Sequence, residues 1–438
     1  MQLRPKSGAG NLRAGLMAAT CALLAPAAKA QAPASDGATD STRVDTGLLY
    51  YQEDQGRVRS VDAIVKLSHD YGDERVLSAT GAVDVLSGGS PNGAVPQKSV
   101  QTFTTPSGSS LVPGGGGEGD DDKGKLYAIA PGAQPLDPNF RDLRVAGDLN
   151  WSQPLGIGST LAANGHLSVE HDFRSASASL LYSRDFNSKN TTLGMGLSGE
   201  FDRINPIGGV PVAGSDYASF LKDGNASKHV LGAQLGITQV LARNWIAQLN
   251  LSADKANGYL NDPYKILSHV DATGLTSGYR FESRPDSRQQ HSVWLGNKVA
   301  LGSSVLDLSF RYGADDWGIS SGTIEARYRF RIGGAAYLEP QLRWYRQDAA
   351  DFYRLYLTDA DLAMREVSAD PRLGAFTAKT IGVKLGLPRD NGGELALRLE
   401  AYQQDPREHS SALPGLSGLD LNPRLRSLLL QVDWRFGF

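Results

Sequence analysis

The chain has 438 residues, a formal net charge of −3 at pH 7 and a mean hydropathy of −0.30. Its only cysteine is Cys21, so the rest of the chain has no disulfide framework, thiolate metal site or cysteine nucleophile. This charge balance also argues against nucleic acid as a partner.

The first thirty residues have the features of a secretory signal peptide. Three basic residues precede an apolar run over 16–28, and the small-x-small cleavage signal AKA follows at 28–30. The apolar run is too short to span a membrane as a helix. We expect cleavage after Ala30 and a periplasmic segment over 31–42. Removal of the signal would leave 40 basic and 47 acidic residues, a net charge of −7.

Beyond that segment, apolar and polar residues alternate along one stretch after another. A period of two predicts strands that have one apolar and one polar face. We place strands at 43–52, 57–69, 75–86, 142–152, 158–171, 174–186, 190–202, 227–240, 243–255, 288–300, 304–315, 320–332, 335–347, 377–387, 393–404 and 424–438.

The connections between these strands alternate between short turns and long loops. If the C-terminus is periplasmic, the long connections 87–141, 203–226, 256–287, 348–376 and 405–423 all fall on the outer side. An even strand number with this division is typical of single-chain outer-membrane proteins. We predict an all-β fold, a closed antiparallel transmembrane β-barrel over 43–438 with about sixteen strands, fourteen and eighteen being the alternatives.

The connection 87–141 is rich in Gly, Pro and Ser and contains PGGGGEGDDDKGK at 113–125, which predicts an exposed flexible loop. Its run Asp120 to Asp122 could attract a divalent cation. The run lacks the alternating ligand spacing and the glycine of a calcium loop. We therefore predict no metal site, and the sequence indicates no cofactor.

The strand predicted at 320–332 places three arginines on one face. Such a face needs a wet or counter-charged interior. The same reasoning predicts a charged lumen lined by Lys298, Asp307, Arg311, Glu325, Arg327, Arg329, Arg331, Glu339, Arg343, Lys384, Arg398, Glu400, Asp433 and Arg435. These residues could brace the wall by pairing across neighbouring strands, or select a solute, and the two roles are compatible.

The chain ends in LLLQVDWRFGF, 428–438, in which apolar residues alternate with mostly polar ones. The stretch resembles the C-terminal signal that the outer-membrane insertion machinery reads, carried here by Leu430, Val432, Trp434, Phe436 and Phe438. The expected partners are therefore outer-membrane lipid and that machinery during biogenesis, with periplasmic proteins as an open alternative.

Two motifs suggest enzymes, and neither has the required context. GMGLSG at 194–199 matches a dinucleotide fingerprint but lies inside an alternating strand. GISSG at 318–322 matches a nucleophile elbow around Ser320, yet a strand and not a helix follows it. None of the histidines stands in a recognisable partner motif for a serine nucleophile, namely His69, His166, His171, His229, His269, His291 and His409.

Several stretches are similar to one known family. SPNG at 90–93, YLNDPYK at 259–265 and AADFYR at 349–354 are its most specific pieces. On these residues the chain resembles a proteobacterial family of predicted outer-membrane β-barrels of unknown function. The resemblance covers nearly all of the chain after the signal and implies the fold and an outer-membrane location. It implies no established activity, and the insertion 94–135 is longer than the family pattern.

Three functions remain open from the sequence. The first is a pore or transport channel for a small hydrophilic solute through the charged lumen. The second is a non-conducting barrel that anchors or scaffolds periplasmic or surface partners. A barrel-embedded hydrolase is the third.

Overall fold

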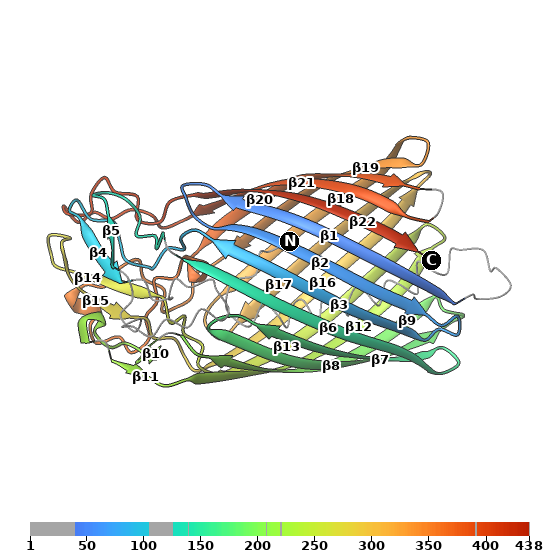
Figure 1. Cartoon of the computed structure of the whole chain (residues 1–438), viewed down its shortest axis with the longest axis horizontal. Coiled ribbons are helices and arrows are strands. Elements are labelled where there is room, and N and C mark those ends of the chain that lie inside the picture. Colours follow the sequence, from blue (N-terminus) through green and yellow to red (C-terminus); the bar gives the residue numbers. More distant parts are fainter. Residues whose placement is uncertain are drawn as a thin grey trace, which may run out of the picture.

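The computed structural model describes residues 40–104, 126–138, 140–206, 208–219, 221–389 and 392–437. Sixteen strands form one closed barrel (Figure 1). They are β1 (Ser41–Glu53), β2 (Arg59–Asp70), β3 (Val76–Ser87), β6 (Arg141–Gly156), β7 (Ser159–Val169), β8 (Phe173–Phe186), β9 (Thr191–Ile204), β12 (Ala226–Ala242), β13 (Trp245–Gly258), β16 (Ser287–Leu301), β17 (Ser304–Asp315), β18 (Ser320–Gly333), β19 (Ala336–Gln347), β20 (Phe376–Pro388), β21 (Glu394–Pro406) and β22 (Leu425–Gly437).

The barrel closes where the first strand meets the last. β1 pairs antiparallel with β22 from Arg43 opposite Gly437 to Glu53 opposite Ser427. Closure leaves no strand edge unpaired, which is the condition for a sheet to lie in lipid. The predicted fold class and sixteen strands are confirmed, and each strand lies within a few residues of its predicted place. The predicted signal peptide lies outside the described residues.

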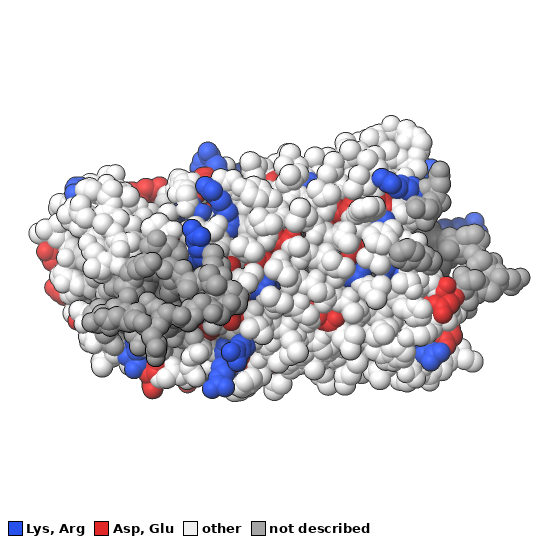
Figure 2. All heavy atoms as spheres, viewed as in Figure 1, with Lys and Arg blue, Asp and Glu red and all other residues white. Residues whose placement is uncertain are grey.

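The two faces of the sheet differ as the period of two requires. In β22 Leu430 and Trp434 are about half exposed, whereas the alternate residue Leu429 is 5% exposed. Exposed Leu, Val and Ile side chains recur on the outward face of the other strands. Figure 2 shows a barrel side that is mostly free of charge between its two ends. Of the predicted C-terminal signal, Phe438 lies outside the described residues.

Short elements in the outer loops extend the structure beyond one end of the barrel (Figure 1). Three two-stranded sheets lie there, β4 (Gln101–Thr104) with β5 (Leu126–Ile129), β10 (Val210–Pro211) with β11 (Lys222–Asp223), and β14 (Ile266–Val270) with β15 (Thr276–Phe281). The 3-10 turns η1 (Tyr217–Ser219), η2 (Asp359–Asp361) and η3 (Pro371–Leu373) accompany them. No helix in the described ranges is long and apolar enough to span a membrane.

The outer loops pack on one another and form what we call the cap, the described residues of 88–140, 205–225, 259–286, 348–375 and 407–424. Its core includes Leu267, Leu357 and Val367, all with 0% exposure. Full burial of one such side chain contributes about 1.5–3 kcal/mol. The apolar core of this protein therefore lies mainly in its loops.

Cap contacts cross the mouth of the barrel. The Ile266 amide donates to the Asn92 carbonyl at 2.8 Å. Asn92 follows β3, the third strand of the ring, and Ile266 follows β13, the ninth strand. The two strands stand six positions apart in a ring of sixteen, so the loops meet across the mouth.

The prediction of an exposed loop over 87–141 is wrong for both of its described ends. Val95 is 1% exposed and Phe103 is 2% exposed, and Tyr127 packs in the same cluster as Phe103. These apolar residues lie in a stretch rich in turn-forming residues, and the exposed-loop prediction followed the composition. The DDD run at 120–122 lies outside the described residues.

Gly93 is a point of close backbone approach in the cap. Its φ is +98°, a region that residues with a side chain rarely adopt. A Cβ at this position would also overlap the carbonyl oxygen of Ile266. The cross-mouth contact therefore requires glycine, the last residue of the SPNG motif.

Candidate functional site: the barrel lumen and its outer rim

The fourteen charged residues predicted for the lumen share one face of the sheet. Residues that pair directly across neighbouring strands point to the same face of the sheet. Lys298 pairs with Asp307, Asp307 with Arg327, and the later strands continue this face to Glu400, which pairs with Leu429. The residues between them in each strand form the exposed apolar face. Since Leu430 and Trp434 point outward, this face points inward. The structure thus brings together on one inner wall residues that lie far apart in sequence.

Most of these residues form ion pairs with neighbours on the inner wall. Lys298 pairs with Asp307 at 3.6 Å, Arg329 with Glu339 at 2.7 Å, and Arg398 with Glu400 at 3.2 Å. Three further pairs are Arg327–Glu325 at 2.5 Å, Lys384–Glu394 at 3.4 Å and Arg435–Asp45 at 2.6 Å. The wall-bracing role is compatible with this geometry.

Water still reaches several of these side chains. The side chains of Lys298, Arg329 and Arg435 are 46%, 47% and 48% exposed although they point inward. Arg331, the next inward residue on β18, is also exposed. All four lie in the halves of their strands that are remote from the cap. The interior on that side is a solvent-accessible vestibule.

An aromatic side chain organises part of this vestibule. The Tyr337 hydroxyl donates to Glu394 Oε1 at 2.8 Å, and the Arg329 guanidinium lies 4.4 Å from the centre of its ring. The ring covers Gly386, where a Cβ would overlap it. The glycine therefore lets Tyr337 lie flat against the wall and hold an arginine toward the lumen.

The inner face is divided into two walls of opposite charge. The basic wall, the inward residues of β16 to β22, has ten basic and seven acidic residues. The acidic wall, those of β1 to β13, has four basic and eleven acidic residues. The members beyond the predicted set are Arg288, Asp315 and Glu394 on the basic wall, and Arg43, Lys66, Arg144, Lys228, Asp45, Glu53, Asp62, Asp70, Asp84, Asp142, Asp148, Asp185, Glu200, Asp202 and Asp254 on the acidic wall.

The acidic wall is most tightly packed near the cap. Lys228 Nζ lies 2.6 Å from Asp202 Oδ2 and 3.9 Å from Glu200 Oε1. The side chains of both acids are 0% exposed, and that of Lys228 is 6% exposed. One lysine between two buried carboxylates stabilises this end of the wall, since a buried charge needs a partner.

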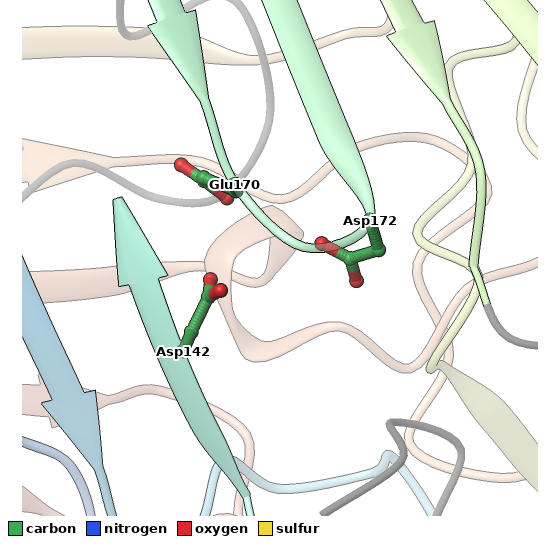
Figure 3. Close-up of side chains that lie close together, drawn as sticks. All are labelled: Asp142, Glu170 and Asp172. Carbon is green, nitrogen blue, oxygen red and sulfur yellow. The ribbon is translucent and has the colours of Figure 1, made fainter. Parts of the chain in front are cut away.

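Three carboxylates converge at the outer rim, where β6 begins near the β7–β8 turn. Figure 3 shows Asp142, Glu170 and Asp172 lying close together on these elements. Their ligand oxygens all lie within 4.8 Å of one another, an arrangement that hard cations favour. Tyr264 of the YLNDPYK motif donates to Asp172 Oδ2 and so ties the cap to this rim. The sequence did not signal this cluster because Asp142, on β6, lies far along the chain from Glu170 and Asp172, which share the β7–β8 turn.

A buried ion network joins two loops of the cap. Arg284 pairs with Glu282 at 2.7 Å and with Asp370 at 2.8 Å, and Arg372 pairs with Asp262 at 2.6 Å. Burial would raise the pKa of Asp370, but Arg372, Arg284 and Lys265 outweigh it and hold the pKa far below its usual value. For Glu282 burial dominates and raises the pKa, although Arg284 opposes it.

The family motifs of the sequence meet in this network. Lys265, the last residue of YLNDPYK, donates to Ser90 Oγ at 3.2 Å and to the Pro91 carbonyl, both in SPNG. Phe352 and Tyr353 of AADFYR pack in a neighbouring apolar cluster with Trp317. The motifs therefore build the cap, whereas the lumen residues lie outside the three most specific motifs.

The enzyme-like motifs have structural roles. Ser320 begins β18 beside the turn at 316–319 and donates to Asp348 Oδ2 at 2.7 Å. GMGLSG lies within β9. A groove of about 410 Å³ lies on the outward face, lined by Ala233, Leu251, Tyr312 and neighbours, so it belongs to the apolar exterior.

Comparisons with solved structures find barrels with little sequence identity. A bacterial polysaccharide outer membrane secretin is 11% identical, with 92% of this chain and 100% of that chain covered and a TM-score of 0.43. OpdK of Pseudomonas aeruginosa with vanillate is 10% identical, with 91% and 99% covered and a TM-score of 0.39. The CymD monoaromatic hydrocarbon channel is 7% identical, with 92% and 89% covered and a TM-score of 0.40.

No curated protein matches the chain in sequence. One family model does match, over residues 13–436, and its description is "Protein of unknown function" (DUF3570). The match spans nearly the whole chain, including every strand of the barrel. The protein is a closed β-barrel of sixteen antiparallel strands, and it belongs to the DUF3570 family.

Proposed function

We propose that this protein is a channel of the bacterial outer membrane for a small hydrophilic solute, exported through a cleaved signal peptide. The supporting observation is the solvent accessibility of the inner wall at the end remote from the cap. Inward side chains such as Arg329 and Arg435 stay about half exposed, while the outward face is apolar. Barrels of sixteen strands are wide enough to enclose an aqueous channel. The cap covers the outer mouth and would control entry.

The lumen charges fit a polar solute better than an apolar one. A wall of ion pairs presents both signs along the path and lowers the cost of moving a hydrated molecule through a low-dielectric barrel. In this proposal the solute takes the place of water beside charges that are already paired. It needs no covalent chemistry from the chain.

Conductance in planar bilayers tests this function. The refolded protein should produce discrete current steps in simple salt. The variant Gly93→Val, which cannot keep the cross-mouth contact, should increase the open time or the current. Absence of current from both proteins, with the barrel shown to be folded by its heat-dependent gel mobility, would contradict the channel.

A non-conducting barrel that anchors partners is the second candidate, because outer loops pack on one another across the mouth. Conductance of the wild type and of Gly93→Val distinguishes this candidate from the channel. Current from Gly93→Val alone would show a pore that the cap keeps shut. Absence of ion current from both the wild type and Gly93→Val would favour the anchoring role.

A further inference from the structure

The two walls of the lumen face each other with opposite charge at mid-height. β6 is the fourth strand of the ring and β18 the twelfth, so the two stand eight positions apart, halfway round the ring of sixteen. Asp148 lies near the middle of β6, and Arg327 near the middle of β18. An acidic residue of one wall thus stands across the lumen from the arginine-bearing strand of the other.

We propose that the channel selects small zwitterionic solutes, whose anionic group turns to the arginines of β18 and whose cationic group turns to Asp148. This inference rests on the proposed channel function and names its solute class. It follows from the placement of charge on the two walls, and neither wall alone would provide it.

Asp148 is suited to meet a cationic group. Its side chain is 39% exposed, which leaves part of the carboxylate open to the lumen. His166 Nδ1 lies 2.8 Å from Asp148 Oδ1 and fixes the orientation of the carboxylate. Next to this pair the inward residues are small and uncharged, among them Ser177, Ser179 and Asn164. Space in front of the acidic wall is therefore available to a solute.

The β18 side is suited to meet an anionic group. Arg327 and Arg329 are paired with Glu325 and Glu339, yet their side chains remain 37% and 47% exposed. Arg331 extends the row and is exposed too. Three arginines with two acidic partners leave a net positive charge on this part of the wall.

A dipolar solute gains from both walls, whereas a simple ion gains from one and is repelled by the other. For a unit charge pair about 4 Å apart in water the attraction changes an equilibrium by on the order of fivefold. Low-dielectric walls strengthen the field in a narrow passage. Orientation across the lumen therefore favours a zwitterion over an anion of the same shape.

Taurine and propane-1-sulfonate test this directly, because they differ only in an ammonium group that replaces a methyl group. Proteoliposomes with the full-length mature chain should take up taurine on the order of fivefold faster than the sulfonate. A neutral pentose serves as the reference for an open channel, and protein-free liposomes give the background.

Variants locate the effect. Asp148→Asn should remove the taurine preference and leave pentose flux unchanged. Asp73→Asn is the matched control, since Asp73 is an exposed acid in the periplasmic turn and pairs with Arg75 outside the lumen. Arg327→Gln is a second lumen variant for the case that Asp148→Asn does not fold, and it should slow taurine more than the pentose.

Each outcome decides something. Equal uptake of taurine and the sulfonate, with pentose entering, overturns the zwitterion inference and leaves the channel standing. Entry of none of the three probes, through the wild type or through Gly93→Val, overturns the channel itself. A taurine preference over the sulfonate that survives Asp148→Asn, or a ratio of taurine to pentose uptake that Arg327→Gln leaves unchanged, contradicts the assigned residues and with them the inference.

Discussion

The cap and the lumen are built from the same ionic groups and differ in their contact with water. In the cap, Arg284, Glu282 and Asp370 have side chains that are at most 4% exposed. In the lumen, Lys298 and Arg329 pair with acids and stay nearly half exposed. An ion pair therefore does not by itself indicate a stabilising role. The exposed fraction of its side chains distinguishes a pair that holds the fold together from one that faces the lumen.

The energetic consequence separates the two regions. Removal of one partner from a buried pair leaves a buried charge and costs about 3–5 kcal/mol, whereas an exposed pair contributes about 0–1 kcal/mol. Substitutions in the cap should change folding, and those in the lumen should change transport.

The largest effect is expected from Arg284→Ala. The change leaves Glu282 and Asp370 buried without their shared cation and should destabilise the cap by about 3–5 kcal/mol. Limited proteolysis should cut the loops 259–286 and 348–375 much faster, while the barrel keeps its heat-dependent gel mobility. An unchanged cleavage rate would mean that the network does not hold the cap.

Gly93→Val should have the next largest effect. The new side chain meets the Ile266 carbonyl oxygen in a backbone region that disfavours it, which costs about 1–3 kcal/mol. Hydrogen exchange should become faster at Ile266 and around it. Gly56→Val is the control, because Gly56 also has positive φ in an outer turn but nothing lies near its Cβ. Equal effects of the two changes would assign the loss to backbone strain alone.

Cap stability should also depend on pH in two steps. Glu282 has a raised folded-state pKa, so its proton binding favours the folded cap as pH falls toward about 4.3, the unfolded value. Asp370 has a lowered pKa, so its contribution is present above about 3.9 and is lost at lower pH.

Proteolysis by an acid-active protease across this range should therefore show a cap that is most resistant at about pH 4.3 and that loosens below about pH 3.9. Asp370→Asn should abolish the loosening at low pH. If the wild-type cap resisted cleavage equally at pH 3 and pH 6, the linkage would be wrong.

The smallest effect on stability, and a clear one on transport, is expected from Arg331→Glu. The residue is exposed on the inner wall, so the change should alter stability by about 0.5 kcal/mol or less. The reversal potential in a salt gradient should shift toward cation selectivity. Arg75→Glu in the exposed periplasmic turn is the control, and identical selectivity of the two variants would make Arg331 irrelevant to permeation.

The barrel was predictable because strand alternation is a local signal. In β22 every second residue from Leu430 to Trp434 is apolar, and short turns such as 302–303 mark where strands reverse. The lumen set followed from the same alternation, since arginines opposite an apolar face must point inward. The sequence alone thus indicated which face the charged residues share. It did not indicate which of them form ion pairs or how exposed their side chains are.

The cap was not predictable by these means. Contacts such as Asn92 with Ile266 join loops far apart in sequence and follow no period, and the composition of 87–141 suggested exposure where Phe103 is buried. The specific motifs SPNG and YLNDPYK were the available signal, because two unusual stretches in different loops can be neighbours. The carboxylates at the outer rim gave no signal at all.

Cysteine accessibility tests the central claim, that alternate residues face water inside and lipid outside. Cys21 is the only native cysteine and lies in the predicted signal peptide, so an introduced cysteine would be the only thiol of the mature chain. In membranes, a charged membrane-impermeant thiol reagent should label Arg329→Cys on the inner face and spare Leu342→Cys, 60% exposed on the outer face of the neighbouring strand. Equal labelling of both positions, or labelling of Leu342→Cys alone, would contradict a wet lumen inside an apolar barrel.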